Sequence, residues 1–152
     1  MGLGSHGGEF MQSRSVLVAF LGVAGLLLAC GMAKKANECS ALIDRVNSAQ
    51  QETSSIQFTM DTSSDDIKKM ADVFEKLAKD LGAMEIGTEE LKGFRDEYKT
   101  MAEKAGAATR KLAEAVDKTD AATLEAAQKE LDAATDPEDK LVDKINEFCS
   151  AS

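Results

Sequence analysis

The chain has 152 residues, enough for one domain, and its net charge of −9 at pH 7 argues against binding to nucleic acid or to anionic lipid. Its one histidine is His6, so the rest of the chain contains no His-based acid–base pair and no His ligand for zinc or haem. We therefore predict a protein that is not an enzyme and that holds no metal and no cofactor.

Residues 1–10 have the sequence MGLGSHGGEF, which is Gly-rich and precedes Met11, itself a suitable start. We interpret them as an upstream extension from a misassigned start or as a cloning remnant, and we assign them no part in the fold. An N-myristoylation signal would need Ser or Thr where His6 stands.

An uncharged apolar run follows Arg14 and extends from Val16 to Ala29. A basic residue followed by a short apolar stretch is typical of a secretory signal. The 14 residues of the run would span about 21 Å as a helix, whereas the hydrocarbon core of a bilayer is roughly 30 Å thick. Continued to Ala33 the run has 18 residues, just enough for a tilted span, so length alone leaves an uncleaved anchor as an alternative.

The end of this stretch, Leu27-Leu28-Ala29-Cys30, resembles the bacterial lipobox, in which a leucine and small residues precede an obligatory cysteine. The resemblance implies that Cys30 receives a diacylglycerol and that a peptidase cleaves between Ala29 and Cys30. It implies a lipoprotein signal peptide at 11–29 and a lipidated tether at 30–37, and nothing about the domain that follows. The alternative is a chance cysteine in an ordinary signal or anchor helix.

The residue after the cysteine bears on localisation. In the enteric sorting pattern, Asp at this position retains a lipoprotein at the inner membrane, whereas Gly31 stands here. Two or three acyl chains are enough to hold a protein stably on a bilayer. We therefore expect a cell-envelope protein anchored in the membrane through Cys30, at the outer membrane rather than the inner membrane.

Residues 38–152 have the composition of a helical domain, with four segments whose apolar residues recur every three or four positions. The first apolar stripe runs from Cys39 to Ile56. The second segment opens at Ser63, a good N-cap that is followed by acidic residues, and Gly82 is placed to end it.

The third segment opens at Thr88 and carries the longest stripe, which consists of Leu91, Phe94, Tyr98, Met101, Ala105, Ala108, Leu112 and Ala115. Gly106 lies among alanines there, so we expect a neighbouring helix to come close. The fourth segment begins near Thr119-Asp120, and Asp136-Pro137 interrupts it, with Pro at the first helical position after a capping Asp. The stripe stays in phase beyond the proline, which predicts one long kinked helix or two nearly collinear ones.

Four amphipathic helices with short connections near 57–62, 83–87 and 117–120 predict an all-α fold. We expect an antiparallel up-down-up-down four-helix bundle after a cleaved signal peptide, with its last helix kinked at Pro137. In that topology the first helix starts and the last helix ends at the same end of the bundle. Cys39 and Cys149 stand at these positions, so we predict a disulfide between them; the alternative is two unpaired buried thiols.

Other groups of residues are candidates for binding, although each has a simpler structural explanation. Carboxylates able to attract a hard cation form two clusters, Asp61, Asp65, Asp66 and Asp136, Glu138, Asp139. Neither has the spacing of an EF-hand, and helix capping accounts for both.

Four methionines, for which core packing is the simpler explanation, are candidates for a soft-metal or adaptable surface: Met60, Met70, Met84 and Met101. Lys34 and Lys35 are candidates for contact with lipid headgroups, worth about 2 kcal/mol at best.

We therefore expect a non-enzymatic envelope lipoprotein that acts as a structural or protein-interaction module and binds another envelope protein. The first alternative is an acidic inhibitor or immunity-type lipoprotein that caps a cationic secreted enzyme, a role that suits the net charge of −9. The second is a carrier of an apolar ligand inside the bundle. The alanines of the stripes argue against a carrier because they bring the helices together.

Overall fold

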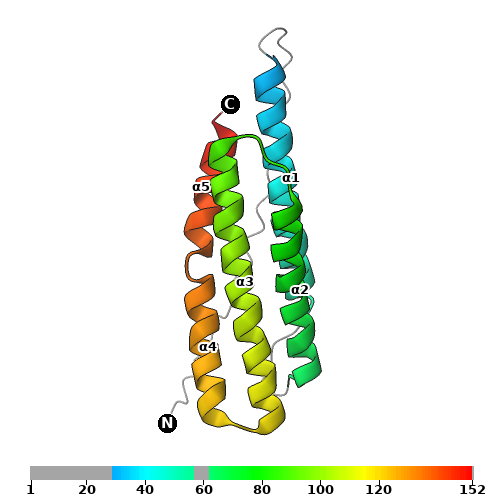
Figure 1. Ribbon diagram of the computed structural model, residues 1–152, viewed down its shortest axis with the longest axis vertical. Coiled ribbons are helices and arrows are strands. Elements are labelled where there is room, and N and C mark those ends of the chain that lie inside the picture. The colour runs from blue at the N-terminus through cyan, green and yellow to red at the C-terminus, as the bar shows by residue number, and fades with distance from the viewer. Residues whose placement is uncertain (1–28, 57–61, 152) are drawn as a thin grey trace, which may run out of the picture.

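The computed structural model describes residues 29–56 and 62–151, which form five α-helices and no strand (Figure 1). The helices are α1 Ala29–Ser54, α2 Ser64–Ala83, α3 Glu89–Lys118, α4 Ala121–Thr135 and α5 Glu138–Ser150. None of these described helices combines the length and the apolarity that a membrane span needs. The predicted extension at 1–10 and the apolar run from Val16 lie outside the described residues, apart from Ala29.

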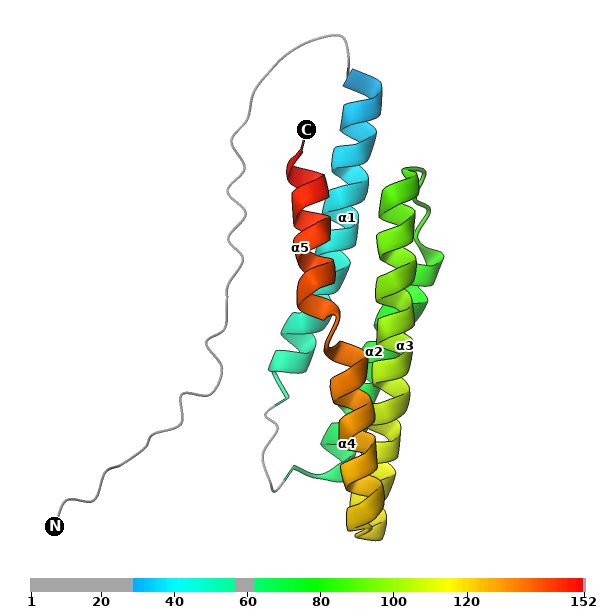
Figure 2. The same ribbon diagram turned by 90° about the vertical axis from the view of Figure 1, so that its left-hand side faces the viewer.

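The helices form the predicted antiparallel up-down-up-down bundle, in which α4 and α5 together make the fourth rod (Figures 1 and 2). Helices α2 and α3 pack together extensively, and α4 packs on α3. Helix α1 lies beside α5 and the adjoining part of α2, and its first turns extend beyond the other helices (Figures 1 and 2). The backbone of the predicted tether 30–37 therefore belongs to α1 and is helical.

The core consists of two clusters that follow this arrangement. The larger cluster joins α1, α5 and the adjoining parts of α2 and α3, and its most buried side chains include Leu42, Leu81, Leu91 and Tyr98. The smaller cluster joins α2, α3 and α4 through Ile67, Leu112, Ala113 and Ala127. Within the described residues, the bundle is thus built around two apolar centres, one at each end.

Small residues set the spacing between α2 and α3, as expected. A Cβ added at Gly106 would lie 3.3 Å from Cγ of Glu75 and 3.4 Å from Cβ of Phe74. The predicted close approach of a neighbouring helix at Gly106 is confirmed, and that neighbour is α2. Both helices also bury alanines, such as Ala71 of α2 and Ala105 of α3.

The predicted helix ends are confirmed in part. The Ser63 hydroxyl accepts a hydrogen bond from the backbone N–H of Asp66, as an N-cap does. Asp120 caps α4 by accepting from the N–H groups of Ala122 and Thr123, each at 3.1 Å. Gly82 does not end α2, because the helix continues to Ala83 and the capping residue is an extended Met84.

The break in the fourth rod differs in detail from the prediction. Asp136 does not cap α5, because it has helical backbone angles and its N–H donates to the carbonyl of Asp132. Pro137 itself takes the N-cap position, and the apolar stripe stays in phase beyond it, with Leu141 and Ile145 buried. Of the two alternatives, the structure has two helices, and α5 lies closer to α1 than α4 does (Figure 2).

Candidate functional site: the groove between α1 and α5

A disulfide joins α1 and α5 near the start of the first helix and the end of the last. The sulfur atoms of Cys39 and Cys149 lie 2.12 Å apart, and their Cα atoms lie 5.9 Å apart. The predicted pairing is therefore present in the structure. It brings together two residues that are 110 positions apart in the chain, and it holds α5 against α1 at this end.

A polar contact joins the same two helices further along. Gln50 of α1 donates a hydrogen bond of 3.2 Å to the carboxylate of Glu138, the first residue of α5. The hydroxyl of Tyr98 from α3 donates to the same carboxylate oxygen. Tyr98 is 1% exposed, and its burial, together with the charge of Glu138, raises the pKa of the phenol. Tyr98 is thus held protonated as a donor, and Glu138 links three helices.

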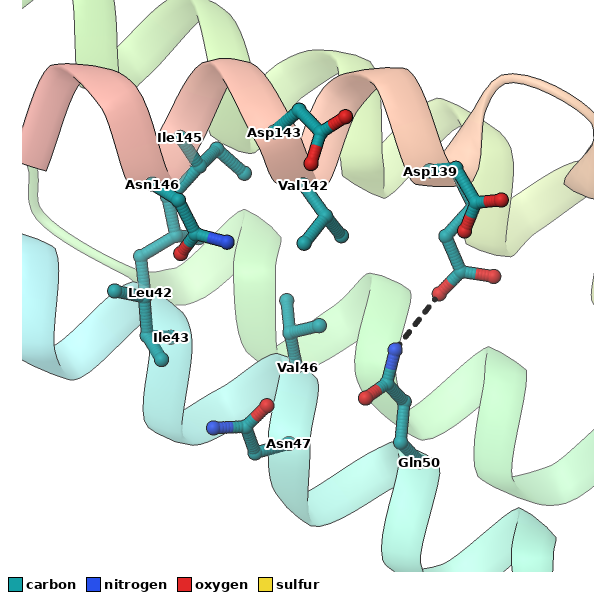
Figure 3. Close-up of a pocket in the computed structure, with 11 residues that line it drawn as sticks. Leu42, Ile43, Val46, Asn47, Gln50, Asp139, Val142, Asp143, Ile145 and Asn146 are labelled. Atoms are coloured by element: carbon teal, nitrogen blue, oxygen red, sulfur yellow. Dashed lines mark hydrogen bonds between the residues drawn. The ribbon is translucent and has the colours of Figure 1, made fainter. Parts of the chain in front are cut away.

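Between these two linkages α1 and α5 enclose an open groove of about 340 Å³ (Figure 3). Val46 of α1 and Val142 of α5 point toward one another across it (Figure 3). The remaining apolar lining residues are Leu42, Ile43 and Ile145. The polar lining residues are Asn47, Gln50, Glu138, Asp139, Asp143 and Asn146. The groove therefore has an apolar floor and a polar rim.

The charged groups on the rim are all acidic. None of the described residues that line the groove is Lys or Arg, whereas Glu138, Asp139 and Asp143 contribute carboxylates. Within the described part of the chain, Asp139 and Asp143 form no ion pair. Elsewhere on the surface acids are commonly paired, as Glu75 is with Arg110 at 2.8 Å. The rim of the groove therefore carries two carboxylates, Asp139 and Asp143, with which no cationic side chain pairs within the described residues.

A carboxylate of α1 caps α3, a contact that the sequence analysis missed. Thr88 stands at the predicted N-cap of α3, but its side chain makes no capping hydrogen bond to the helix. Instead Glu38 accepts hydrogen bonds from the N–H groups of Gly87 at 2.9 Å and Thr88 at 3.1 Å. Hydrogen bonds from the Thr88 side chain and the Gly87 backbone hold the pKa of Glu38 below its usual value. Glu38 thereby ties α1 to the connection between α2 and α3.

We expect Glu38→Gln to lower the urea midpoint of unfolding at pH 7, because the carboxylate is stabilised only in the folded state. A carboxyl whose pKa is lowered by folding stabilises the protein above its unfolded pKa, and this contribution disappears as the pH falls through the folded pKa. The difference between Glu38→Gln and the unchanged protein should therefore shrink as the pH falls below about 4.3, the ordinary value for glutamate. Urea melts of both proteins at pH 7 and pH 3 measure this difference in midpoint. Glu97→Gln, at an exposed position of α3, is the control; a pH-independent difference for Glu38→Gln would contradict the prediction.

The other residues that the sequence analysis named as candidate sites do not come together at one site in the described part of the chain. Cys30 is the second residue of α1, and its side chain lies outside what the structure describes. Asp65 and Asp66 lie in the first turn of α2 and pair with Lys68 and Lys69, as the capping interpretation expects. Asp61 and Met60 lie outside the described residues. Among the described residues, no group of three or more His, Cys, Asp or Glu is placed to hold a metal ion.

The lysines next to the predicted lipid site contact the protein itself. The Nζ atom of Lys34 lies 3.9 Å from Oε1 of Glu38, with which it forms an ion pair. Lys35 donates to the backbone carbonyl of Ala151 at 2.9 Å, and its ammonium lies 4.2 Å from the ring centroid of Phe148. Lys35 therefore joins the first turns of α1 to the end of α5, close to the disulfide.

Comparison with known proteins gives no family for this chain. No protein-family model matches the sequence. No curated protein and no solved structure matches it either. Function is therefore inferred from the chain's own residues and their geometry.

Proposed function

We propose that this protein is a non-enzymatic lipoprotein of the cell envelope that acts as a structural or protein-interaction module. The observation that carries the proposal is the position of Cys30, at the end of an uncharged apolar run and within a sequence that resembles the lipobox. Acyl chains on Cys30 anchor the chain in the membrane, and Cys30 lies in the first turn of α1.

Helix α1 connects the lipid site at Cys30 to the bundle, and this supports a role in presenting a surface at a defined distance from the membrane. Helix α1 continues without a break from Cys30 past Leu42 and Gln50, which line the groove. With a rise of 1.5 Å per residue, these residues lie about 18 Å and about 30 Å along the helix from Cys30. The partner we propose for this surface is another envelope protein, and nucleic acid is not a partner because the net charge is −9.

We expect Cys30→Ser to abolish acylation, since the thiol is the atom that receives the lipid. Labelling of producing cells with a fatty-acid probe, followed by capture of the protein, measures it. Met32→Ser is the matched control, because it introduces the same residue two positions away and should label as the unchanged protein does. Equal labelling of the Cys30→Ser protein would remove the basis of the lipoprotein proposal.

The outer membrane is the proposed location, because Gly31 and not Asp follows Cys30. Density-gradient separation of inner and outer membranes tests this assignment. Recovery of the acylated protein with the inner membrane would contradict it.

A second candidate is an acidic inhibitor or immunity-type lipoprotein that caps a cationic secreted enzyme. The observation that favours it is the rim of the groove, where Asp139 and Asp143 carry charge without an ion-pair partner among the described residues. Affinity purification of the lipidated protein from envelope extract, with identification by mass spectrometry, separates the two candidates. A single stoichiometric cationic enzyme favours the inhibitor, whereas porins or assembly proteins favour the structural module.

A further inference from the structure

We infer that the groove between α1 and α5 binds a segment of a partner protein that presents lysine or arginine side chains about one helical turn apart. The inference rests on the proposed function, because it names the surface and the partner chemistry of the interaction module. It is carried by the combination of an apolar floor, an acidic rim and two linkages that hold the groove open.

The apolar floor fits the aliphatic part of such side chains. Leu42, Val46 and Ile145 are buried beneath the groove, and Ile43 and Val142 are half-buried along it. Lysine and arginine lay their methylene stems on apolar surface while their charged ends stay in a polar environment. A purely apolar ligand would leave the carboxylates of the rim without a partner, and an anionic ligand would be repelled by them.

The spacing of the rim carboxylates matches that of cationic side chains on a partner helix. Asp139 and Asp143 are four residues apart on α5, so they lie on one face of that helix, about 6 Å apart along its axis. Two cationic side chains separated by one turn of a partner helix have the same spacing. The carboxamides of Asn47 and Asn146 provide further hydrogen-bonding groups on the opposite and adjoining walls.

The two linkages at the ends of the groove reduce the cost of binding. The Cys39–Cys149 disulfide holds one end, and the hydrogen bond from Gln50 to Glu138 holds the other. A groove whose walls are already held at their spacing loses little conformational freedom when a ligand enters, which favours affinity. A second copy of this chain would bring a further net charge of −9 to an acidic rim, so a cationic partner is the favoured occupant.

The test uses the full-length protein in detergent and a synthetic peptide of about 15 residues with a leucine stripe flanked by lysines at i and i+4. A peptide with glutamate in place of every lysine is the probe control. Fluorescence anisotropy measures the Kd of each peptide. We expect the lysine peptide to bind, the glutamate peptide not to bind, and the combined variant Asp139→Asn with Asp143→Asn to weaken binding about tenfold, as the loss of two exposed ion pairs implies.

The matched control variant combines Glu85→Gln with Glu90→Gln, which removes the same charge at exposed positions outside the groove. Its Kd should stay within about twofold of the unchanged protein. Equal weakening by the two variants would mean that total charge and not the groove attracts the peptide, and this would overturn the inference. No binding of the lysine peptide, or a dimer that forms through the groove and is lost in the Asp139→Asn, Asp143→Asn variant, would overturn it as well.

The outcome is independent of the test of the anchor. Peptide binding by purified protein does not require acylation, so a failure of the Cys30→Ser prediction leaves the groove measurement intact. Failure of peptide binding, in turn, leaves the acylation result and the envelope purification unchanged.

Discussion

Replacing Cys39 and Cys149 together by serine is expected to lower the free energy of unfolding by about 4–5 kcal/mol. The disulfide closes a loop of 110 residues, and in the chain-entropy model a closed loop of this size removes that much free energy from the unfolded ensemble. This is a large fraction of the roughly 5–15 kcal/mol that stabilises a typical domain.

Urea melts of the purified protein, before and after the double substitution, measure the change. Met32→Ser is the control, because Met32 is 57% exposed and its replacement leaves the disulfide and the lipid site in place, so the midpoint should stay nearly unchanged. Non-reducing peptide mapping should show the Cys39 and Cys149 peptides linked. Free, alkylatable thiols at both positions in the native protein would contradict the disulfide and with it the explanation of the groove's spacing.

Leu112→Ala is expected to lower the free energy of unfolding by about 2–5 kcal/mol, because the change leaves a cavity in a packed core. Leu112 is 2% exposed and lies in the cluster that joins α2, α3 and α4. In this cluster, large side chains are few, and Ala113 and Ala127 beside Leu112 cannot fill the space that its removal leaves.

The neighbouring Lys111→Ala provides the comparison. Lys111 is half exposed and forms an ion pair of 2.6 Å with Glu130 of α4, which is also half exposed. Exposed pairs of this kind contribute about 0.2–1 kcal/mol, so Lys111→Ala should cost far less than Leu112→Ala in the same urea melts. Equal and small effects of the two substitutions would show that this face of α3 is solvated and would contradict the packing of the bundle described above.

The helical class and the order of the segments follow from local patterns in the sequence. Apolar residues at intervals of three and four define one face of a helix wherever they occur, and caps such as Ser63 and Asp120 act on the residues next to them. The pairing of Cys39 with Cys149 was also predictable, because an antiparallel topology of four helices brings the two ends of the domain together.

The sequence patterns were less accurate in the details of the helix ends, and at one of them a residue far away in the chain supplies the hydrogen bonds. Gly82 is a suitable helix terminator, yet α2 continues past it to Ala83. Thr88 is a suitable cap, yet the N–H groups around it bond to Glu38, which is 49 and 50 residues away in the chain. Asp136 is a suitable cap as well, but it remains helical and Pro137 takes the capping position.

The sequence by itself determined the four amphipathic segments, their buried faces and the pairing of Cys39 with Cys149, because each depends on spacing along the chain. The lipidation of Cys30 stays a prediction from its sequence motif. Only the tertiary structure decided that Glu138 binds Gln50 and Tyr98, and that a groove with an acidic rim lies between the disulfide and this contact. Gln50 and Glu138 are 88 residues apart. No local periodicity specifies such a pair, because its geometry depends on how far two helices separate once their cores have packed.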